Sequence, residues 1–391
     1  MTNDGRFEAI VQSEGLNCQA VIAVNEDHLR FEGPGKILIV PYSNIDLFYI
    51  NNYRMYIETD NIGQITLSKM GRDMDSMYEQ LWNGYNDRTL KAFFVSGTPM
   101  FETEGEYRYS EDGGEARGRA KIKLYEDCLC ILPPDAGARR IPLCFMREPV
   151  MTDFTISMAL DTDEHYEVIR LGSSTRRLFE LINENIRAVL DKAAATALEM
   201  DGSLSSEQVT SIARLMPEGA AASAFALGGI SQAYLEALEV NIARSRAASA
   251  YEYFKEICSP RELFIGIKSG LSRNEEGRAV WVAAAKDGGG QGAAAVELAL
   301  GEESAAATYL YRFSGDRDSF FKRLNHAMEA ISFRREVVSM PYEELARPEN
   351  DLYAMAVKRT GALRFLRSCF AGRAIHRTKE SWRRAVDEVF Q

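Results

Sequence analysis

The chain repeats one arrangement three times: a block of short strand-like runs ends at a glycine and is followed by a helix with aromatic or leucine residues on one face. The glycines are Gly71, Gly172 and Gly315, and the helices are expected over residues 72–86, 173–190 and 316–331. A short antiparallel sheet leaves ends open, and an amphipathic helix is a way to cover one of them. The arrangement therefore predicts small α+β units, each made of a strand block and a closing helix.

The first strand block extends from Phe7 to Leu67 and is interrupted only by turn residues. Turns are expected at residues 25–27, 33–35 and 60–63, which are rich in Asn, Asp, Gly and Pro. The expected strands are 7–11, 18–24, 28–31, 37–40, 45–50, 54–58 and 64–67. This block and its helix are long enough for a small domain.

Landmarks of the first block recur about one hundred residues later in the same order. Glu26-Asp27 is matched by Glu126-Asp127, and each pair is followed by a turn that contains proline. Pro41 is matched by Pro142, and each block then has a hairpin before its closing helix. Several ordered landmarks at one spacing indicate an internal duplication.

These features resemble the pleckstrin-homology-like (PH-like) superfold in its GRAM-like or bacterial version. The resemblance rests on a hairpin ending in Pro34, a strand leading into Val-Pro-Tyr-Ser-Asn-Ile at 40–45, further hairpins and one C-terminal amphipathic helix. It covers about residues 7–195, and the second copy departs from it with Pro-Leu-Cys-Phe at 142–145. The resemblance implies two tandem bent antiparallel barrels, each closed by a C-terminal helix, that serve as platforms for protein, peptide or lipid-headgroup recognition.

The remaining sequence predicts an Ala-rich helical connector, a third strand block with its closing helix, and a helical C-terminus. A chain of 391 residues exceeds what one hydrophobic core usually serves. The expected fold class is α+β, and five segments are expected. They are a first PH-like domain at 1–96, a second at 101–200, a helical connector at 205–260, a small α+β domain at 261–340 and a basic helical C-terminus at 341–391. The small α+β domain is either a reduced third copy of the repeated unit or a different domain.

The charge is unevenly distributed along the chain. The net charge is −11, yet residues 355–391 contain nine Lys or Arg and only three Asp or Glu. The acidic body argues against nucleic acid as the main partner. The basic helical tail fits docking on its own acidic body, on another protein or on an anionic membrane. Its candidate surface consists of Arg364, Arg367, Arg373, Arg377, Lys379, Arg383 and Arg384.

A second group of cations lies at the start of the second block. Arg117, Arg119, Lys121 and Lys123 alternate with small or apolar residues, so a strand would place them on one face. Arg139 and Arg140 follow in a nearby turn. The PH-like resemblance suggests that these six residues bind an anionic headgroup. The residues themselves favour a solvated strand face that discourages edge pairing.

Signals for catalysis, metals and cofactors are weak. The four histidines are far apart, and none has the spacing of a metal ligand pair. Residues 288–292 are glycine-rich but lack the Lys-Ser/Thr of a phosphate-binding loop. The six cysteines include no C-x-x-C pair and fit reduced thiols, and the N-terminus lacks a signal-peptide pattern, so we expect a cytoplasmic protein. No metal, cofactor or catalytic residue is predicted.

We therefore predict a non-enzymatic intracellular binding or scaffold protein whose tandem domains recognise a protein or peptide partner. One alternative is a peripheral membrane protein that binds anionic lipid through the second domain and the basic C-terminus. Another is an enzyme with a site in residues 261–340, where His326 is the candidate. The sequence does not predict the oligomeric state.

Overall fold

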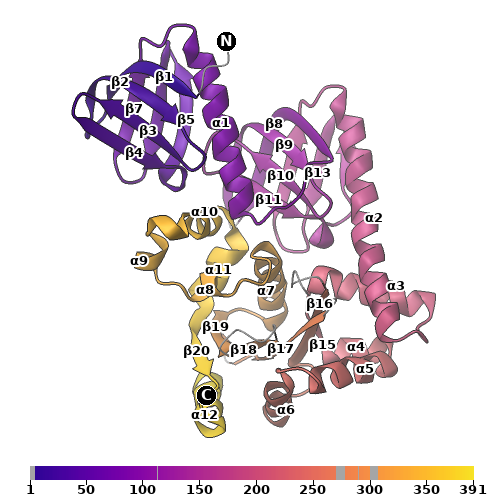
Figure 1. Cartoon of the computed structure of the whole chain (residues 1–391). Coiled ribbons are helices and arrows are strands. Elements are labelled where there is room, and N and C mark those ends of the chain that lie inside the picture. The colour runs from indigo at the N-terminus through magenta and orange to yellow at the C-terminus, as the bar shows by residue number, and fades with distance from the viewer. Residues whose placement is uncertain (1–4, 112, 270–277, 289, 300–306) are drawn as a thin grey trace.

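The computed structural model describes residues 5–111, 113–269, 278–288, 290–299 and 307–391. The chain is a mixture of α-helices and antiparallel β-sheets, as the sequence predicts. We call β1–β7 with helix α1 the first unit, β8–β14 with α2 the second unit, and the sheet β15–β20 with its helices the third unit. Figure 1 shows the first two units side by side and the third unit below them.

The first two units have the same topology. Their sheets have the orders β4-β3-β2-β1-β7-β6-β5 and β11-β10-β9-β8-β14-β13-β12. The first unit contains β1 (Arg6–Gln12), β2 (Asn17–Val24), β3 (His28–Gly33), β4 (Lys36–Pro41), η1 (Tyr42–Asn44), β5 (Ile45–Asn51), β6 (Arg54–Thr59), β7 (Gly63–Ser68) and α1 (Asp73–Ala92). The second contains β8 (Phe101–Glu111), β9 (Gly114–Leu124), β10 (Cys128–Leu132), β11 (Arg139–Pro142), η2 (Leu143–Phe145), β12 (Val150–Thr152), β13 (Thr155–Ala159), β14 (His165–Ile169) and α2 (Ser174–Met200).

From η1 to α1, the first unit matches the second residue by residue at an offset of 101. Tyr49 pairs with Tyr56 in one sheet, and Val150 pairs with Ser157 in the other. The hairpins between these strands turn through Asn52-Tyr53 and Asp153-Phe154, and all four residues have positive φ. Two successive positive φ values are the geometry of a tight hairpin turn whose twist suits the flanking strands. Positive φ also recurs at Gly71 and Gly172, where each sheet hands over to its helix.

The third unit is a six-stranded antiparallel meander, β15-β16-β17-β18-β19-β20. Its strands are β15 (Ala222–Ser223), β16 (Leu263–Ser269), β17 (Arg278–Lys286), β18 (Gln291–Ala299), β19 (Ala307–Ser314) and β20 (Phe370–Ile375). The sequence predicted only four strands and a wholly helical C-terminus, and the structure corrects this expectation. The sheet takes strands from all three of the predicted C-terminal segments, because β15 and β20 are defined by pairing with β16 and β19 rather than by a pattern of their own.

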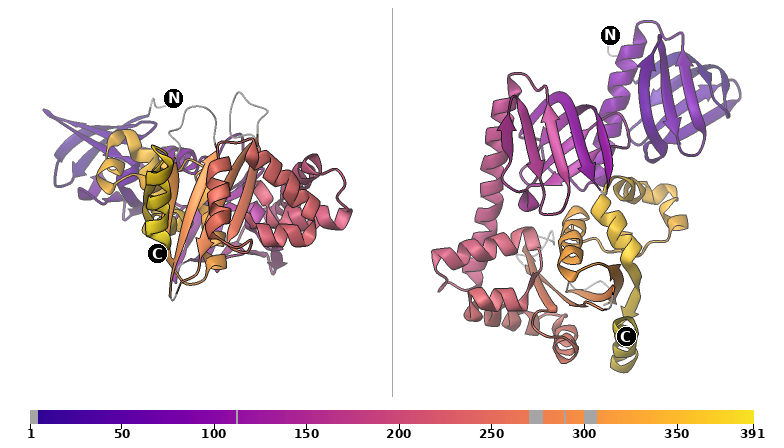
Figure 2. Two further views of the ribbon diagram at one scale, coloured as in Figure 1. Left: turned by 90° about the horizontal axis from the view of Figure 1, so that it is seen from below. Right: turned by 180° about the vertical axis from the view of Figure 1, so that it is seen from behind.

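Helices cover both faces of the third sheet. One face packs against α3 (Ser206–Leu215), α4 (Ala224–Ile230), α5 (Gln232–Ala243), α6 (Ala248–Ile257) and α12 (Lys379–Phe390). The other packs against α7 (Arg317–Ala330), α8 (Glu336–Ser339) and α11 (Gly361–Cys369). The strands are therefore apolar on both sides, which explains their alanine-rich sequences. Figure 2 shows this layered arrangement from two further directions.

The C-terminal helices return to the first unit. After α9 (Tyr342–Leu345) and the turn η4 (Pro348–Asn350), α10 (Asp351–Arg359) packs on α1. Met355 is completely buried in the core of the first unit, and Arg359, also fully buried, donates a hydrogen bond to the hydroxyl of Tyr85. Lys358 forms an ion pair with Asp46. Much of the basic tail thus belongs to the folded body.

An ion pair at this contact generates the first prediction. Arg88 of α1 donates to both carboxylate oxygens of Asp351, with its Nε 2.9 Å from Oδ2, and the two side chains are only 16% and 10% exposed. Removing one partner of a mostly buried pair leaves an uncompensated charge. We expect Asp351→Ala to lower the free energy of unfolding by about 3 kcal/mol in urea titrations, and Arg88→Met with Asp351→Leu to restore most of it.

The matched control is Glu180→Ala, which breaks the exposed pair between Glu180 and Arg176 on α2. An exposed pair of this kind contributes little, so this variant should change the free energy of unfolding by less than about 0.5 kcal/mol. Equal effects of Asp351→Ala and Glu180→Ala would contradict the account of the α1–α10 contact.

Candidate functional site

The open edge of the first sheet is occupied by a segment of the second unit. The amide of Phe48 on β5 donates to the carbonyl of Pro134 at 3.0 Å, and the amide of Ala136 donates to the carbonyl of Asp46 at 2.8 Å. Leu47 and Asp135 form an isolated antiparallel bridge between these bonds. Residues 134–136 therefore add a short extra strand to β5. We call them the cis segment, because they belong to the same chain as the sheet edge that they bind.

Helix α1 holds Leu132, which leads into the cis segment. The indole Nε1 of Trp82 donates to the carbonyl of Leu132 at 3.1 Å, and Asn86 donates to the same oxygen at 3.4 Å. Trp82 is only 1% exposed. Burial raises the pKa of Asp135, whose carboxylate accepts a bond of 2.6 Å from the Gly137 amide. We call the space between β5 and α1 the first groove; it binds an extended segment in cis.

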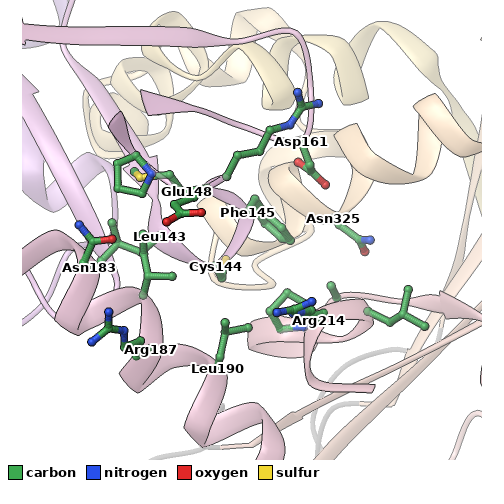
Figure 3. Close-up of a pocket in the computed structure, with 17 residues that line it drawn as sticks. Leu143, Cys144, Phe145, Glu148, Asp161, Asn183, Arg187, Leu190, Arg214 and Asn325 are labelled. Atoms are coloured by element: carbon green, nitrogen blue, oxygen red, sulfur yellow. The ribbon is translucent and has the colours of Figure 1, made fainter. Parts of the chain in front are cut away.

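The equivalent position in the second unit is an open cavity. Its volume is about 480 Å³, and it lies between the η2–β12 segment, α2, η3 and α7. Figure 3 shows labelled side chains of the η2–β12 segment, α2, α3 and α7 around this space. On α2 the lining residues are Asn183, Ile186, Arg187 and Leu190, which correspond at the offset of 101 to Trp82, Tyr85, Asn86 and Thr89 of the first groove. We call this cavity the second groove.

The edge of the second groove differs from that of the first in one hydrogen-bonding group. Pro149 stands at the position equivalent to Phe48, whose amide donates to the cis segment. Proline has no N–H, so this backbone donor is lost. Arg147 stands where Asp46 supplies its accepting carbonyl. An occupant of the second groove must therefore find most of its donors on side chains.

Three arginines supply such donors. Arg147, Arg187 and Arg214 line the second groove, all are exposed, and none forms an ion pair with another residue in the described part of the chain. The groove also contains two carboxylates. Asp161 is bonded to His326 at 2.6 Å, whereas Glu148 is exposed to solvent. The guanidinium groups therefore outnumber the carboxylates that remain available to them.

His326 lies beside this groove but is buried. Its ring stacks on Phe145 at 4.2 Å between centroids, is bonded to Asp161 and is only 4% exposed. The enzyme alternative needs a nucleophile next to such a pair. Among the described residues, no hydroxyl or thiol group has a hydrogen bond to this imidazole. Cys144 lines the cavity, but burial raises the pKa of its thiol well above the usual value, which opposes activation as a thiolate.

Most of the cations predicted to bind an anionic headgroup are paired with carboxylates of the same chain. Lys121 lies 3.1 Å from Glu79 and its ammonium group sits over the Trp82 ring. The other pairs are Arg119 with Glu104, Lys123 with Glu102, Arg139 with Glu111, and Arg140 with both Asp127 and Glu329. Arg117 is exposed. The pattern identified the charged strand; Glu102 and Glu104 lie across from it on the neighbouring strand β8, whereas Glu79 and Glu329 come from distant segments.

The predicted basic C-terminal surface is split in the structure. Arg364 and Arg367 donate to backbone carbonyls of neighbouring segments, and Arg383 pairs with Glu256 at 2.8 Å. The remaining four residues, Arg373, Arg377, Lys379 and Arg384, are exposed. The surface is therefore smaller than the sequence suggested.

Sequence reasoning did not identify the arginines of the second groove. A signal existed in the repeat: at an offset of 101, Asn183 stands in place of the aromatic Trp82, and Arg187 in place of Asn86. A change from an aromatic to a polar residue on a closing helix indicates that this surface of the second unit does not pack against the same kind of segment as in the first unit. Arg214 comes from the third unit, so no repeat could reveal it.

The chain matches no protein-family model, and no curated protein resembles it significantly. Within the described ranges, no three His, Cys, Asp or Glu side chains are grouped as metal ligands would be. None of the helices formed by these residues combines the length and the apolar character needed to cross a bilayer.

The raised pKa of Cys144 gives a second prediction. Because only the thiolate is alkylated, iodoacetamide should modify Cys144 in the folded chain at pH 8 at least about tenfold more slowly than in the urea-unfolded chain. The folded-state rate should keep increasing as the pH rises beyond the ordinary thiol value of 9.0. Peptide mass spectrometry measures the modification at each cysteine. Equal rates for the folded and unfolded chains at pH 8 would contradict the raised pKa, and a faster rate in the folded chain would show an activated thiol and revive the enzyme hypothesis.

Proposed function

We propose that this chain is a non-enzymatic binding protein, built on two tandem PH-like modules, whose second groove recognises an extended peptide segment of a protein partner. The observation that carries the proposal is the cis segment: the first groove holds residues 134–136 between β5 and α1. The matching position of the second unit is an open cavity of about 480 Å³. Addition of an extended segment to a sheet edge is a common mode of peptide recognition.

The walls of the second groove suit a peptide. Ile186 and Leu190 of α2 are half-buried, and Pro217 of η3 and Phe145 of η2 are buried, so apolar surface is available for alternate side chains of an extended ligand. The Arg147 carbonyl can accept a peptide amide, as the Asp46 carbonyl accepts that of Ala136. The amide oxygen of Asn183 adds a further acceptor, since its amide nitrogen already donates to Phe179.

The competing functions have less support. Five of the six cations expected to bind lipid headgroups are paired with carboxylates of the same chain. An anion would have to break those pairs before it could bind. An enzymatic role would need a reactive group beside His326, and the raised pKa of Cys144 opposes that role.

The test uses two labelled peptides, titrated against the full chain by fluorescence anisotropy. The first has the sequence of residues 131–138, Ile-Leu-Pro-Pro-Asp-Ala-Gly-Ala. The second has Asn in place of the Asp at its fifth position. We expect at least one of them to bind with a Kd below about 1 mM. Leu190→Trp places a larger side chain in the second groove and should weaken this binding at least about tenfold.

Leu198→Trp is the matched control, because Leu198 is exposed on the same helix outside the groove. It should leave binding unchanged, and thermal unfolding should verify that both variants fold. Absence of binding by both peptides up to about 1 mM, or equal binding to the two Trp variants, would contradict the proposed function.

A further inference from the structure

The two grooves differ most in charge. The position of Asp46 in the first groove is taken by Arg147 in the second, and the position of the neutral Asn86 is taken by Arg187. Arg214 joins them from the third unit. Leu47 is replaced by Glu148, which adds one negative charge. The second groove thus presents three arginines against two carboxylates, of which Asp161 is bonded to His326 and Glu148 is solvated.

These differences act together with the loss of the Phe48 donor. Where the first groove uses a backbone N–H to fix its occupant, Pro149 leaves the second groove without that group. Guanidinium groups are donors with five N–H groups each, and they bind carboxylates in a planar, two-bonded geometry. The donors of the second groove are thus suited to negatively charged side chains rather than to neutral backbone carbonyls.

From this geometry we infer that the second groove selects an extended peptide segment that carries an Asp or Glu side chain, which Arg187, Arg214 and Arg147 bind. The inference rests on the proposed function and specifies the partner's chemistry. The chain's own occupant of the first groove shows that an extended segment with a central Asp fits such a position, although the carboxylate of Asp135 bonds within its own segment, to the Gly137 amide. The apolar surface of Ile186 and Leu190 next to the arginines favours a peptide over a free anion, because it can bind neighbouring side chains.

The charges on the rest of the molecule oppose an acidic occupant, so such an occupant must be held locally. The net charge of the chain is −11, so the body as a whole repels acidic partners at long range. Attraction must then come from the groove itself over a distance shorter than the screening length of about 10 Å at moderate salt. Binding should therefore depend on the individual arginines and weaken as salt increases.

The experiment compares the two labelled peptides, which contain either Asp or Asn at the fifth position, on the full chain. The Asp peptide should bind at least about tenfold more tightly than the Asn peptide at low salt. Arg187→Gln and Arg214→Gln should each remove most of this difference while leaving the Asn peptide nearly unaffected. Because both arginines are exposed and unpaired within the described residues, these variants should fold normally.

Arg176→Gln is the matched control, since Arg176 lies on the same helix but is paired with Glu180 outside the groove. It should preserve the preference for the Asp peptide. Raising the salt from about 0.05 M to about 0.3 M should weaken the Asp peptide alone. If Leu190→Trp abolishes binding but the two peptides bind equally, the inference fails and the proposed function stands. If neither peptide binds up to about 1 mM, both fail.

Discussion

The insertion of residues 134–136 between β5 and α1 is the contact on which the arrangement of the first two units depends. Its two backbone bonds to Asp46 and Phe48 join two sheets that are separate in the topology. Trp82 and Asn86 then direct α1 onto the neighbouring carbonyl of Leu132. Backbone bonds at a sheet edge are directional, so the insertion fixes orientation as well as distance between the units. The same contact removes one exposed edge, which would otherwise be available to other chains.

Helix α1 consequently has several partners at once. One side covers the core of its own sheet, Leu90 and the following Phe93 pack against the outer face of β10, and Arg88 holds α10 through Asp351. The basic C-terminus is therefore integrated into the fold at Met355 and Arg359. The second unit is attached to the third in a comparable way, through Arg140 with Glu329 and His326 with Asp161. The second groove lies at this second junction, which explains why Arg214 and Asn325 of the third unit line it.

Local patterns predicted the parts of the fold that local chemistry specifies. The glycines at 71 and 172 mark the junctions between each sheet and its helix, and the hairpin residues mark the turns, because positive φ values are required at these positions. Strands β15 and β20 were not predicted, because pairing with β16 and β19 stabilises them and because β20 directly follows the amphipathic helix α11. The predicted anion-binding cations illustrate the same limit: alternation placed four of the six on a strand, but the carboxylates of Glu79 and Glu329 come from distant segments. The second groove combines residues from five elements, η2, α2, α3, η3 and α7, which only the folded chain brings together.

The central claim is that one of two equivalent grooves is filled in cis while the other is open to an acidic peptide. A crystal structure of the full chain grown with the Asp-containing peptide tests it most directly. The account predicts peptide density in the second groove, with the peptide carboxylate within hydrogen-bonding distance of Arg187 or Arg214, and residues 134–136 still bound to β5. Peptide bound on β5 with the cis segment displaced, or outside both grooves, would contradict the account.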